Sequence, residues 1–538
     1  MSTRRDFLRQ SAELTALLLA SIQRAAAIDP APGSTFEDAE HVVILMQENR
    51  SFDHLYGMMR GVRGYNDPRA VTLPDGNPVW KQSDGKGLSA LPFRLDLRGT
   101  RITWLGSLPH GWDDQTDARA NGNHDQWLVA KPSSRKECAG MPLTMGYYNR
   151  EDLPFYYALA DAFTICDQNF CSSLTGTTPN RLYLWTGKIQ DAAGQANVRN
   201  SEVTYTQTAN WTTFPERLEA AGVSWKIYQN ELSLDTGLDD EEEAWLANYT
   251  DNPIEWFDQF HVGFHPTYQS WLREAEERVA GGSDALRKNP GGKAPSEARK
   301  QLQRLEALLK RVREERAKWS PEAEAKLSAR DRALHAKAFA TNRGDANYRT
   351  LETIRYRDGA EEREMKAPAG DLFYQFRKDV QSGKLPKVSW LVAPKQFSDH
   401  PSAPWYGAWY LAESINILTQ NPEVWKKTIF ILTYDENDGY FDHVPPFVSP
   451  DPSRPETGCV SAGIDARGEY WPLEMDRKRT DSDDARGGPI GLGFRVPMVV
   501  ASPWSRGGYV CSQVFDHTSV VQLLERVCKV KEPNISPW

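Results

Sequence analysis

Short runs of consecutive apolar residues recur along the chain, with stretches of helical periodicity between them. The runs lie at residues 42–46, 163–166, 223–228, 388–392, 428–433 and 496–500. A run without polar alternation indicates a strand covered on both faces, as in a parallel sheet. Amphipathic helical patterns occur between them, at 214–221 and 409–418. Strands alternating with helices predict an α/β fold with a mostly parallel central sheet flanked by helices.

Residues 283–343 interrupt this rhythm with a stretch rich in Lys, Arg, Glu and Ala. Apolar residues recur there at helical spacing, at Leu302, Leu305, Leu308, Leu309 and Val312. Ser320 and Pro321 then have the order expected at a helix start. The stretch predicts a charged helical insertion with a solvated outer face. A lid or a lipid-surface contact is the alternative, although the mixed charge signs differ from those of a basic membrane-binding helix.

The N-terminus has the layout of an export signal. Arg4 and Arg5 precede a modestly apolar stretch at 14–20 and a small-residue site at 25–27. This order predicts a twin-arginine signal peptide over residues 1–27, followed by one catalytic domain over 28–538. An amphipathic N-terminal helix is the alternative. We therefore expect export by the twin-arginine translocation machinery and a periplasmic or secreted protein.

Composition narrows the range of partners and cofactors. The 538 residues carry a net charge of −9, which argues against nucleic acid as a partner and against strong attachment to anionic membranes. Zwitterionic or small phosphorylated substrates remain compatible, as does transient contact with a membrane surface. The six cysteines include no CxxC pair, so a cysteine-based zinc site is not expected, while disulfides are allowed.

Polar side chains follow three of the predicted strands. Glu48 and Asn49 come after the first run, His400 follows the run at 388–392, and Asp435 and Glu436 follow the run at 428–433. Ligand sites in parallel sheets gather beyond the carboxyl ends of the strands. Carboxylate and amide oxygens side by side suit a divalent cation, although Asn49 could instead close a turn. The convergence predicts a metal-assisted site.

A helix is predicted to begin near residue 178. Thr178 suits the N-cap and Pro179 suits the first helical position. The free amides and positive dipole of a helix N-terminus suit a phosphate, although the threonines could serve only as caps.

The residues from Gln47 to Gly57 resemble the signature of a known bacterial family nearly residue for residue. This is the phosphoesterase family that contains phosphocholine-type phospholipases C and related acid phosphatases. Further matching motifs occur at 145–148, 177–181, 399–401, 433–439 and 515–519. The resemblance implies a core related to alkaline phosphatase. It also makes Thr177 the nucleophile, which requires a cation held by Glu48, Asn49, Glu436 and Thr177 itself, because a threonine hydroxyl is otherwise a poor nucleophile.

Other residues receive roles through the same resemblance. His110 and His400 would bind phosphoryl oxygens or protonate the leaving group, and Asp435 would lie next to the phosphoryl group. Four residues would hold the metal and nucleophile loops in place: Arg50, Asp53, Asn180 and Arg181. His443 and His517 match family positions as structural residues, and His124 receives no role.

The motifs at 435–443 and 460–465 look more like those of the phospholipases C than those of the acid phosphatases. We therefore expect hydrolysis of phosphatidylcholine or sphingomyelin to phosphocholine and diacylglycerol or ceramide, through a phosphothreonine intermediate. The cation could be calcium, zinc, magnesium or manganese. A periplasmic acid phosphatase or broad phosphodiesterase is the alternative, and a silent lipid-binding protein is a third reading, against which the retained ligands and nucleophile speak.

Overall fold

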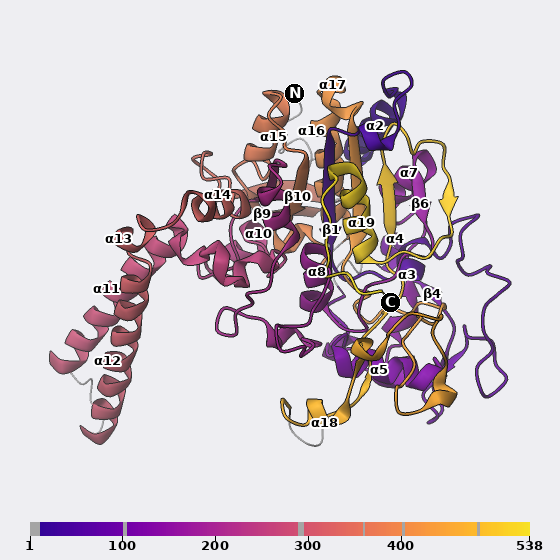
Figure 1. Cartoon of the computed structure of the whole chain (residues 1–538), viewed down its shortest axis with the longest axis horizontal. Coiled ribbons are helices and arrows are strands. Elements are labelled where there is room, and N and C mark those ends of the chain that lie inside the picture. The colour runs from indigo at the N-terminus through magenta and orange to yellow at the C-terminus, as the bar shows by residue number, and fades with distance from the viewer. Residues whose placement is uncertain are drawn as a thin grey trace.

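A seven-stranded sheet lies at the centre of the protein (Figure 1). The computed structural model describes residues 11–100, 105–288, 295–358, 361–400, 404–480 and 485–537. The strands of the sheet are, in spatial order, β15 (Val510–Cys511), β6 (Thr164–Cys166), β14 (Met498–Ala501), β11 (Thr428–Tyr434), β1 (His41–Gln47), β10 (Val388–Val392) and β7 (Trp225–Gln229). Each of the six apolar runs overlaps one of these strands, so the prediction of these six strands is confirmed, whereas no run predicted β15.

The sheet is mostly parallel. β1 pairs in parallel with both β10 and β11, and β10 pairs in parallel with β7. On the other side of β11, β14 runs antiparallel to both β11 and β6. The predicted mixed α/β fold with a mostly parallel sheet is therefore confirmed. The apolar run at 496–500 gave no sign that its strand runs in the opposite direction.

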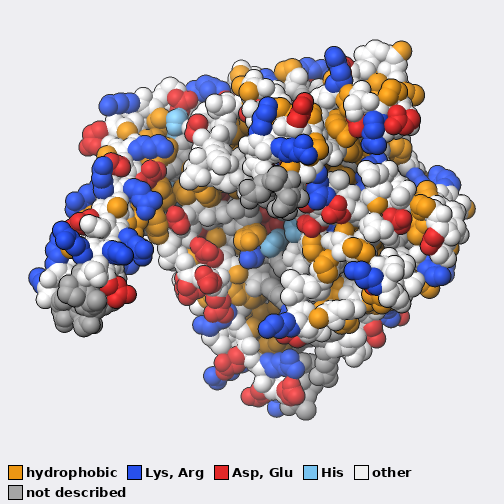
Figure 2. All heavy atoms as spheres, turned by 90° about the horizontal axis from the view of Figure 1, so that it is seen from below, with side chains coloured by type: hydrophobic (Ala, Val, Ile, Leu, Met, Phe, Trp, Pro, Cys, Tyr) orange, Lys and Arg blue, Asp and Glu red, His pale blue; other side chains and the backbone are white. Residues whose placement is uncertain are grey.

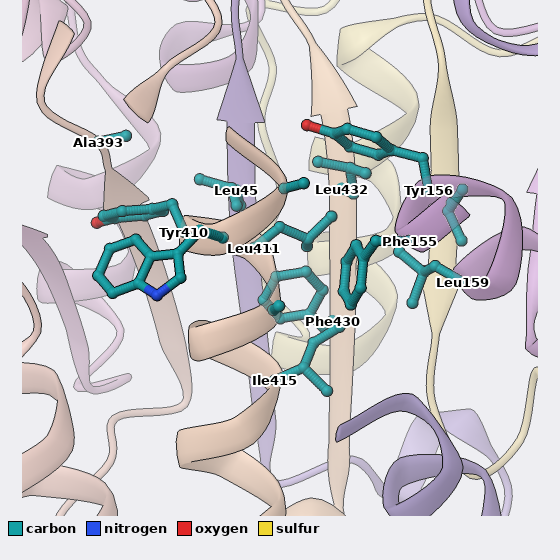
Figure 3. Close-up of a cluster of buried hydrophobic side chains, with 14 of the residues drawn as sticks. Leu45, Phe155, Tyr156, Leu159, Ala393, Tyr410, Leu411, Ile415, Phe430 and Leu432 are labelled. Atoms are coloured by element: carbon teal, nitrogen blue, oxygen red, sulfur yellow. The ribbon is translucent and has the colours of Figure 1, made fainter. Parts of the chain in front are cut away.

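Helices cover both faces of the sheet because the side chains of each strand alternate between the faces. Val43 and Leu45 of β1 lie in one core with α7 (Pro154–Ala162) and α16 (Pro404–Thr419). Figure 3 shows Leu411 and Ile415 of α16 over Phe430 and Leu432 of β11, beside Phe155 and Tyr156 of α7. Burial of each such side chain contributes about 1.5–3 kcal/mol.

A second core lies on the opposite face. Val42, Ile44 and Met46 of β1 pack there with α8 (Thr177–Thr186), α9 (Phe214–Ala220) and α19 (His517–Cys528). Both neighbours of β1 also bury apolar side chains on both faces, which explains why their sequences read as unbroken apolar runs.

Residues 11–27 form helix α2 (Ser11–Ala27), which packs against α16 and α7. Ile22 and Ala25 are buried, and Arg24 donates hydrogen bonds to Asn416 Oδ1 (2.6 Å) and Thr419 Oγ1 (3.0 Å). Arg4 and Arg5 of the predicted export signal lie outside the described residues. In the part of the chain that the structure describes, no helix is long and apolar enough to cross a membrane.

The charged stretch and the segment before it form a pair of long helices that projects away from the sheet (Figure 1), and the first of them begins at Pro266, before the predicted boundary at residue 283. These are α11 (Pro266–Lys288) and α12 (Pro295–Lys318). Val312 packs with Leu272 and Ala275 at the base of the pair, while Arg313 and Arg316 form ion pairs with Glu276. A short helix α13 (Pro321–Glu324) follows with Ser320 as its N-cap, as expected, and α14 (Ala329–Ala338) leads back to the sheet.

The remaining elements connect these layers. The other α-helices are α3 (Phe52–Tyr56), α4 (Leu97–Thr100), α5 (Trp112–Arg119), α6 (Trp127–Ala130), α10 (Asp240–Leu246), α15 (Tyr374–Gln381), α17 (Pro422–Trp425) and α18 (Leu473–Asp476). Four two-stranded pairs complete the set: β2 (Gln82–Ser83) with β3 (Ser89–Ala90), β4 (Phe93–Arg94) with β5 (Gly146–Tyr147), β8 (Leu351–Asp358) with β9 (Glu361–Pro368), and β12 (Tyr470–Trp471) with β13 (Gly488–Pro489).

Candidate active site

The polar segments that follow β1, β10 and β11 meet at one edge of the sheet. The three strands are parallel neighbours, so their carboxyl ends lie side by side. Backbone hydrogen bonds join the segments directly: Glu48 N donates to Ser398 O (2.7 Å), and Arg50 N donates to Glu436 O (3.0 Å). The structure therefore brings together the three loops that the sequence placed after separate strands.

Glu48 and Asn49 are fully buried at the end of β1. Ser398 Oγ donates to Glu48 Oε1 (2.7 Å), while Asn49 donates from its backbone to Asp435 Oδ1 (3.3 Å) and from Nδ2 to Asp438 Oδ1 (3.1 Å). Asn49 has φ 66°, a left-handed conformation that Asn tolerates better than most residues. Glu48 Oε2 and Asn49 Oδ1 have no hydrogen-bond partner among the described residues.

Asp435 and Glu436 are also fully buried, but their surroundings differ. Asp435 accepts from Arg181 Nε (3.0 Å) and from Glu436 N (2.7 Å), so its charge is compensated. Glu436 Oε2 accepts from Asp438 N, whereas Oε1 has no hydrogen bond to any residue described. Burial, followed by the neighbouring Asp435 and Asp438 charges, raises the pKa of Glu436 to about 8, although His110 opposes this shift.

Thr177 is the first residue of α8 and keeps 6% of its surface exposed. The loop before it is held by Asn180, which accepts from Ser173 N (2.9 Å) and donates to the carbonyls of Ser173 and Thr175 (both 3.1 Å). Arg181, on the same helix, connects α8 to Asp435. The contacts of Asn180 and Arg181 therefore link the Thr177 loop to the end of β11.

The predicted start of this helix was wrong by two residues. Gly176 is the N-cap, and Pro179 stands at the third helical position. The amide of Thr178 donates to Asn200 Oδ1 (2.9 Å), so a side chain distant in sequence supplies the cap. A Cβ on Gly176 would lie 3.0 Å from Asn200 Nδ2 and 3.2 Å from His110 Cδ2, which explains glycine here and places His110 beside the start of α8.

His110 lies between the carboxylates of Glu436 and Asp438. Its Nδ1 is 2.6 Å from Leu108 O and 3.1 Å from Asp438 Oδ1, and its Nε2 is 3.8 Å from Glu436 Oε1. Burial alone would lower the pKa of His110, but the two carboxylates outweigh it and raise the pKa to about 10. The imidazole is therefore a cation at neutral pH, and 16% of its side chain is exposed.

His400 has the opposite electrostatic surroundings. Burial, with the nearby His110 charge, lowers its pKa to about 3, so the ring is neutral at neutral pH. The ring lies 4.4 Å from the ring of Tyr249, and its amide donates to Ser398 Oγ (3.4 Å). The two predicted histidines thus differ in charge, and His110 is the one that holds a proton to donate at neutral pH. Figure 2 shows a hollow near the middle of the lower face of the protein, with histidine side chains in it.

Arg50 and Asp53 hold the loops in two different ways. Arg50 donates from Nη2 to Asp399 O (3.1 Å), which ties the β1 loop to the β10 loop. Asp53 belongs to a second buried group, which we call the Arg495 cluster: Asp53, Asp67, Asp442, His443 and Arg495. In this cluster Asp53 accepts from His443 Nδ1 (2.6 Å) and from Arg495 Nη2 (3.0 Å).

The ligand atoms of Asp53, Asp442 and His443 lie within 4.8 Å of one another, so this buried group could hold a metal ion. Arg495, however, already donates from Nε to Asp442 Oδ1 (2.8 Å) and from Nη2 to Asp442 Oδ2 (3.0 Å). The guanidinium thus lies where a cation would have to bind. His443, as expected, has structural contacts, and so does His517, whose Nε2 lies 2.8 Å from Asp435 O.

Sequence reasoning missed several residues of the site. Asp438 has φ 58° and accepts from Leu108 N, Ser107 Oγ and Asn49 Nδ2, so it joins the His110 loop to the β1 loop. Its position within the 433–439 motif was a usable signal. Lys131 donates to Pro109 O (2.8 Å) and Gln115 Oε1 (2.8 Å), and burial lowers its pKa to about 7. Nothing in its sequence surroundings pointed to the site.

Asp251 was also missed. Its Oδ2 lies 3.4 Å from Arg181 Nη2, and its carboxyl lies beside that of Glu48. Burial raises the pKa of Asp251 to about 7, and Asp435 adds to this rise, whereas Arg181 and the adjoining Glu48 carboxyl oppose it. No apolar run precedes Asp251, so the strand-end rule could not find it.

The oxygens of Glu48, Asn49, Asp251, Asp435 and Glu436 form what we call the strand-end cluster. Carboxyl groups outnumber cationic side chains in and around it. Six buried carboxyl groups, those of Glu48, Asp251, Asp399, Asp435, Glu436 and Asp438, surround Arg50, Arg181, His110 and Lys131. The oxygens of Glu48, Asn49 and Glu436 that have no hydrogen-bond partner in the described chain are available to a cation. Hard oxygen donors and an unbalanced negative charge fit a divalent cation, so these residues could hold one.

The sequence model of the phosphoesterase family matches residues 39–283 and 333–531. The chain belongs to the phosphoesterase family. The model does not match residues 284–332, which contain most of the projecting helix pair. The family motifs, in contrast, all lie in the matched residues.

Named relatives in this family are phospholipases C. The chain is 37% identical to the non-hemolytic phospholipase C of Burkholderia pseudomallei and 36% identical to that of Pseudomonas aeruginosa, over 99% and 100% of its length. It covers 63% and 61% of these two relatives, so it spans about three fifths of their length. It is 33% identical to the phospholipase C A of Mycobacterium tuberculosis, over 96% of this chain and 78% of that one.

Proposed function

We propose that this phosphoesterase is a metal-dependent phospholipase C. It hydrolyses phosphatidylcholine or sphingomyelin to phosphocholine and diacylglycerol or ceramide. One observation carries the proposal: a helix that begins with Thr177 lies beside protonated His110 and is connected through Arg181 to the strand-end cluster. The names of the relatives and the resemblance of residues 435–443 to the phosphocholine-preferring enzymes support the substrate class.

Glu48, Asn49, Thr177 and Glu436 are the residues that would hold the cation. When bound, a divalent cation lowers the pKa of a hydroxyl next to it and offsets the negative charge of a phosphoryl group. Calcium, zinc, magnesium or manganese would fit these oxygen ligands. The residue roles that follow are part of the same proposal.

Thr177 Oγ1 attacks phosphorus and gives its hydroxyl proton to neutral His400, and the bond from phosphorus to the alcohol oxygen of diacylglycerol or ceramide breaks. His110 Nε2 gives its proton to that departing oxygen, while Nδ1 remains directed at Leu108 O and Asp438. The positive end of the α8 dipole stabilises the charge on the phosphoryl oxygens. Water then attacks the phosphothreonine and gives a proton to His110, which is now neutral. The bond from phosphorus to Thr177 Oγ1 breaks, His400 returns its proton to that oxygen, and phosphocholine leaves.

Arg181 and Asn180 keep Thr177 in line for attack, because both connect the start of α8 to fixed backbone or to Asp435. Asp435 acts through Arg181, since both of its oxygens accept hydrogen bonds within the site. Arg50 and Asp53 hold the β1 loop from outside the reacting centre.

Phosphorus NMR of the products tests this proposal. The wild-type protein, given phosphatidylcholine, sphingomyelin and a simple phosphomonoester, is expected to release phosphocholine from a lipid. The Thr177→Ala variant should lose about 10³-fold or more of this rate, because no other hydroxyl takes its position. Thr178→Ala is the matched control and should keep most of the activity.

Three outcomes would change the assignment. Inorganic phosphate from the monoester with intact lipids would move the protein to the acid phosphatase branch. Full activity of Thr177→Ala with loss of activity in Thr178→Ala would make Thr178 the nucleophile. Equal rates in all three proteins would exclude both hydroxyls.

We also propose that residues 1–27 direct export through the twin-arginine pathway and that the core is related to alkaline phosphatase. The paired arginines and the small residues at 25–27 support the first proposal, and the family motifs support the second. Replacement of Arg4 and Arg5 by lysines should stop export in a bacterial host with this pathway, as measured by cell fractionation.

A further inference from the structure

A turn at residues 248–252 carries Asp251 into the site from a fourth strand. Gln229, the last residue of β7, accepts from Asn248 Nδ2 (3.1 Å) and from Asn252 Nδ2 (3.3 Å). Asn248 Oδ1 in turn accepts from the amide of Asp251 (3.1 Å). Because β7 lies next to β10, the turn presents Asp251 at the same edge of the sheet as the three family loops.

The carboxyl of Asp251 is buried but poorly satisfied. It is 1% exposed, and neither Oδ1 nor Oδ2 has a hydrogen-bond partner among the residues that the structure describes. The Arg181 guanidinium lies 3.4 Å from Oδ2 but does not hydrogen-bond to it, since its Nε is committed to Asp435 and its Nη1 to the backbone oxygen of Asp251. The ion pair with Arg181 therefore does not explain why both carboxyl oxygens of Asp251 are buried without a hydrogen bond.

The carboxyl of Asp251 lies beside that of Glu48, whose Oε2 also has no partner in the described chain. Two buried carboxyl groups that lie beside each other repel strongly unless a cation or a shared proton lies between them. The partnerless oxygens of Asn49 and Glu436 belong to the same cluster. A cation bound between Asp251 and Glu48 would compensate both carboxylates, whereas a shared proton would compensate only one.

We propose that Asp251 is a further oxygen ligand of the divalent cation held by Glu48, Asn49, Thr177 and Glu436. This inference rests on the metal dependence of the proposed function. It adds a negatively charged ligand from the end of β7, so that the cation site draws on four neighbouring segments of the fold. Loss of this charge should weaken cation binding without disturbing the other ligands.

Manganese binding to metal-stripped protein tests the inference without measuring activity. The wild type, Asp251→Asn and the control Asp258→Asn would be treated with a chelator, dialysed and titrated with Mn²⁺ in a calorimeter. Asp258 is exposed and lies seven positions along the chain, so the control makes the same chemical change outside the cluster. We expect about tenfold or greater loss of Mn²⁺ affinity in Asp251→Asn and no loss in the control.

A ligand exchange gives a second readout. Asp251→Cys replaces a hard oxygen by a soft sulfur, so the Co²⁺-loaded variant should show a sulfur-to-cobalt charge-transfer absorption that wild type lacks. This spectrum decides the question if Asp251→Asn does not fold, as judged by near-ultraviolet circular dichroism. A residue that only holds Arg181 in place would give no such band.

The outcomes separate this inference from the proposed function. Equal Mn²⁺ affinity in wild type and Asp251→Asn, with no cobalt–sulfur band in Asp251→Cys, would overturn the ligand role of Asp251 alone. It would favour a proton shared with Glu48. A wild-type protein that binds no divalent cation would overturn this inference together with the metal dependence.

Discussion

Two buried acidic clusters lie next to each other in this protein, and they differ in how their charges are compensated. In the Arg495 cluster, the fully buried guanidinium of Arg495 donates to Asp53, to Asp442 and to the backbone oxygens of Arg63 and Asp167. In the strand-end cluster, oxygens of Glu48, Asn49, Asp251 and Glu436 are buried without a partner in the described chain.

The sequence hardly separates the two clusters, because both draw on the same two motifs. Glu48 and Asp53 are five positions apart, and Glu436 and Asp442 are six positions apart. The Arg495 cluster is a structural ion network, because a side chain of the protein supplies its cation. The strand-end cluster has more carboxyl groups than cationic side chains and has oxygens without a partner in the described chain, so it suits a cation from solution. Acidic residues in a motif therefore do not reveal by themselves which of them bind metal.

The largest expected effect is a loss of stability when the Arg495 cluster loses its cationic side chain. Arg495→Met leaves Asp53 and Asp442 buried without their cation, which should cost about 3–5 kcal/mol of unfolding free energy. Urea unfolding followed by tryptophan fluorescence measures it. Arg467→Met is the control, because Arg467 pairs with Asp465 at the surface with 79% of its side chain exposed, and should change stability by no more than about 0.5 kcal/mol. Equal effects of the two changes would show that the network is not structural.

A smaller effect concerns pH and His124, whose Nε2 lies 2.7 Å from the backbone oxygen of Asp442. Burial lowers the pKa of His124 to about 4 from the ordinary 6.5, so the folded protein favours the neutral ring. The corresponding stability is fully present above pH 6.5 and is lost as the pH falls towards 4. Between pH 7 and pH 4, the wild type should lose up to about 3 kcal/mol more unfolding free energy than His124→Asn.

Urea unfolding of both proteins at several pH values checks this. Parallel stability curves for the wild type and His124→Asn would mean that His124 has the same pKa in the folded and unfolded protein, which would contradict the lowered pKa caused by its burial.

The smallest expected effect is on cation affinity, which one matched substitution in each cluster measures. Glu48→Gln removes a negative charge from the strand-end cluster, while Ser398 can still donate to the new amide oxygen. We expect Mn²⁺ affinity to fall about 10- to 100-fold and the unfolding free energy of the metal-free protein to stay within about 1 kcal/mol of wild type. Calorimetric titration and urea unfolding measure the two quantities.

Asp53→Asn is the matched change in the other cluster and should show the reverse pattern. It removes a charge that His443 and Arg495 need, so it should destabilise the protein yet leave Mn²⁺ affinity nearly unchanged. Loss of Mn²⁺ affinity in Asp53→Asn with no loss in Glu48→Gln would assign the metal to the Arg495 cluster.

Much of the fold followed from the sequence because its determinants are local. Residues 42–46 and 428–433 are apolar without interruption, and a strand buried on both faces is the arrangement that such a run favours. The helix start after Ser320 also followed from neighbouring residues, since its cap acts across three positions. The start of α8 did not, because its cap comes from Asn200, more than twenty positions away.

The sequence by itself determined the strands, the flanking helices and the loops in which Glu48, Asn49, His400, Asp435 and Glu436 lie, because these depend on patterns within short segments. Only the tertiary structure decided the reversed direction of β14, the protonated state of His110, the entry of Asp251 from the end of β7, and the division of the acidic residues into a compensated and an uncompensated cluster. Each of these features depends on contacts between residues that are far apart along the chain, because burial and charge depend on which residues are close together in space.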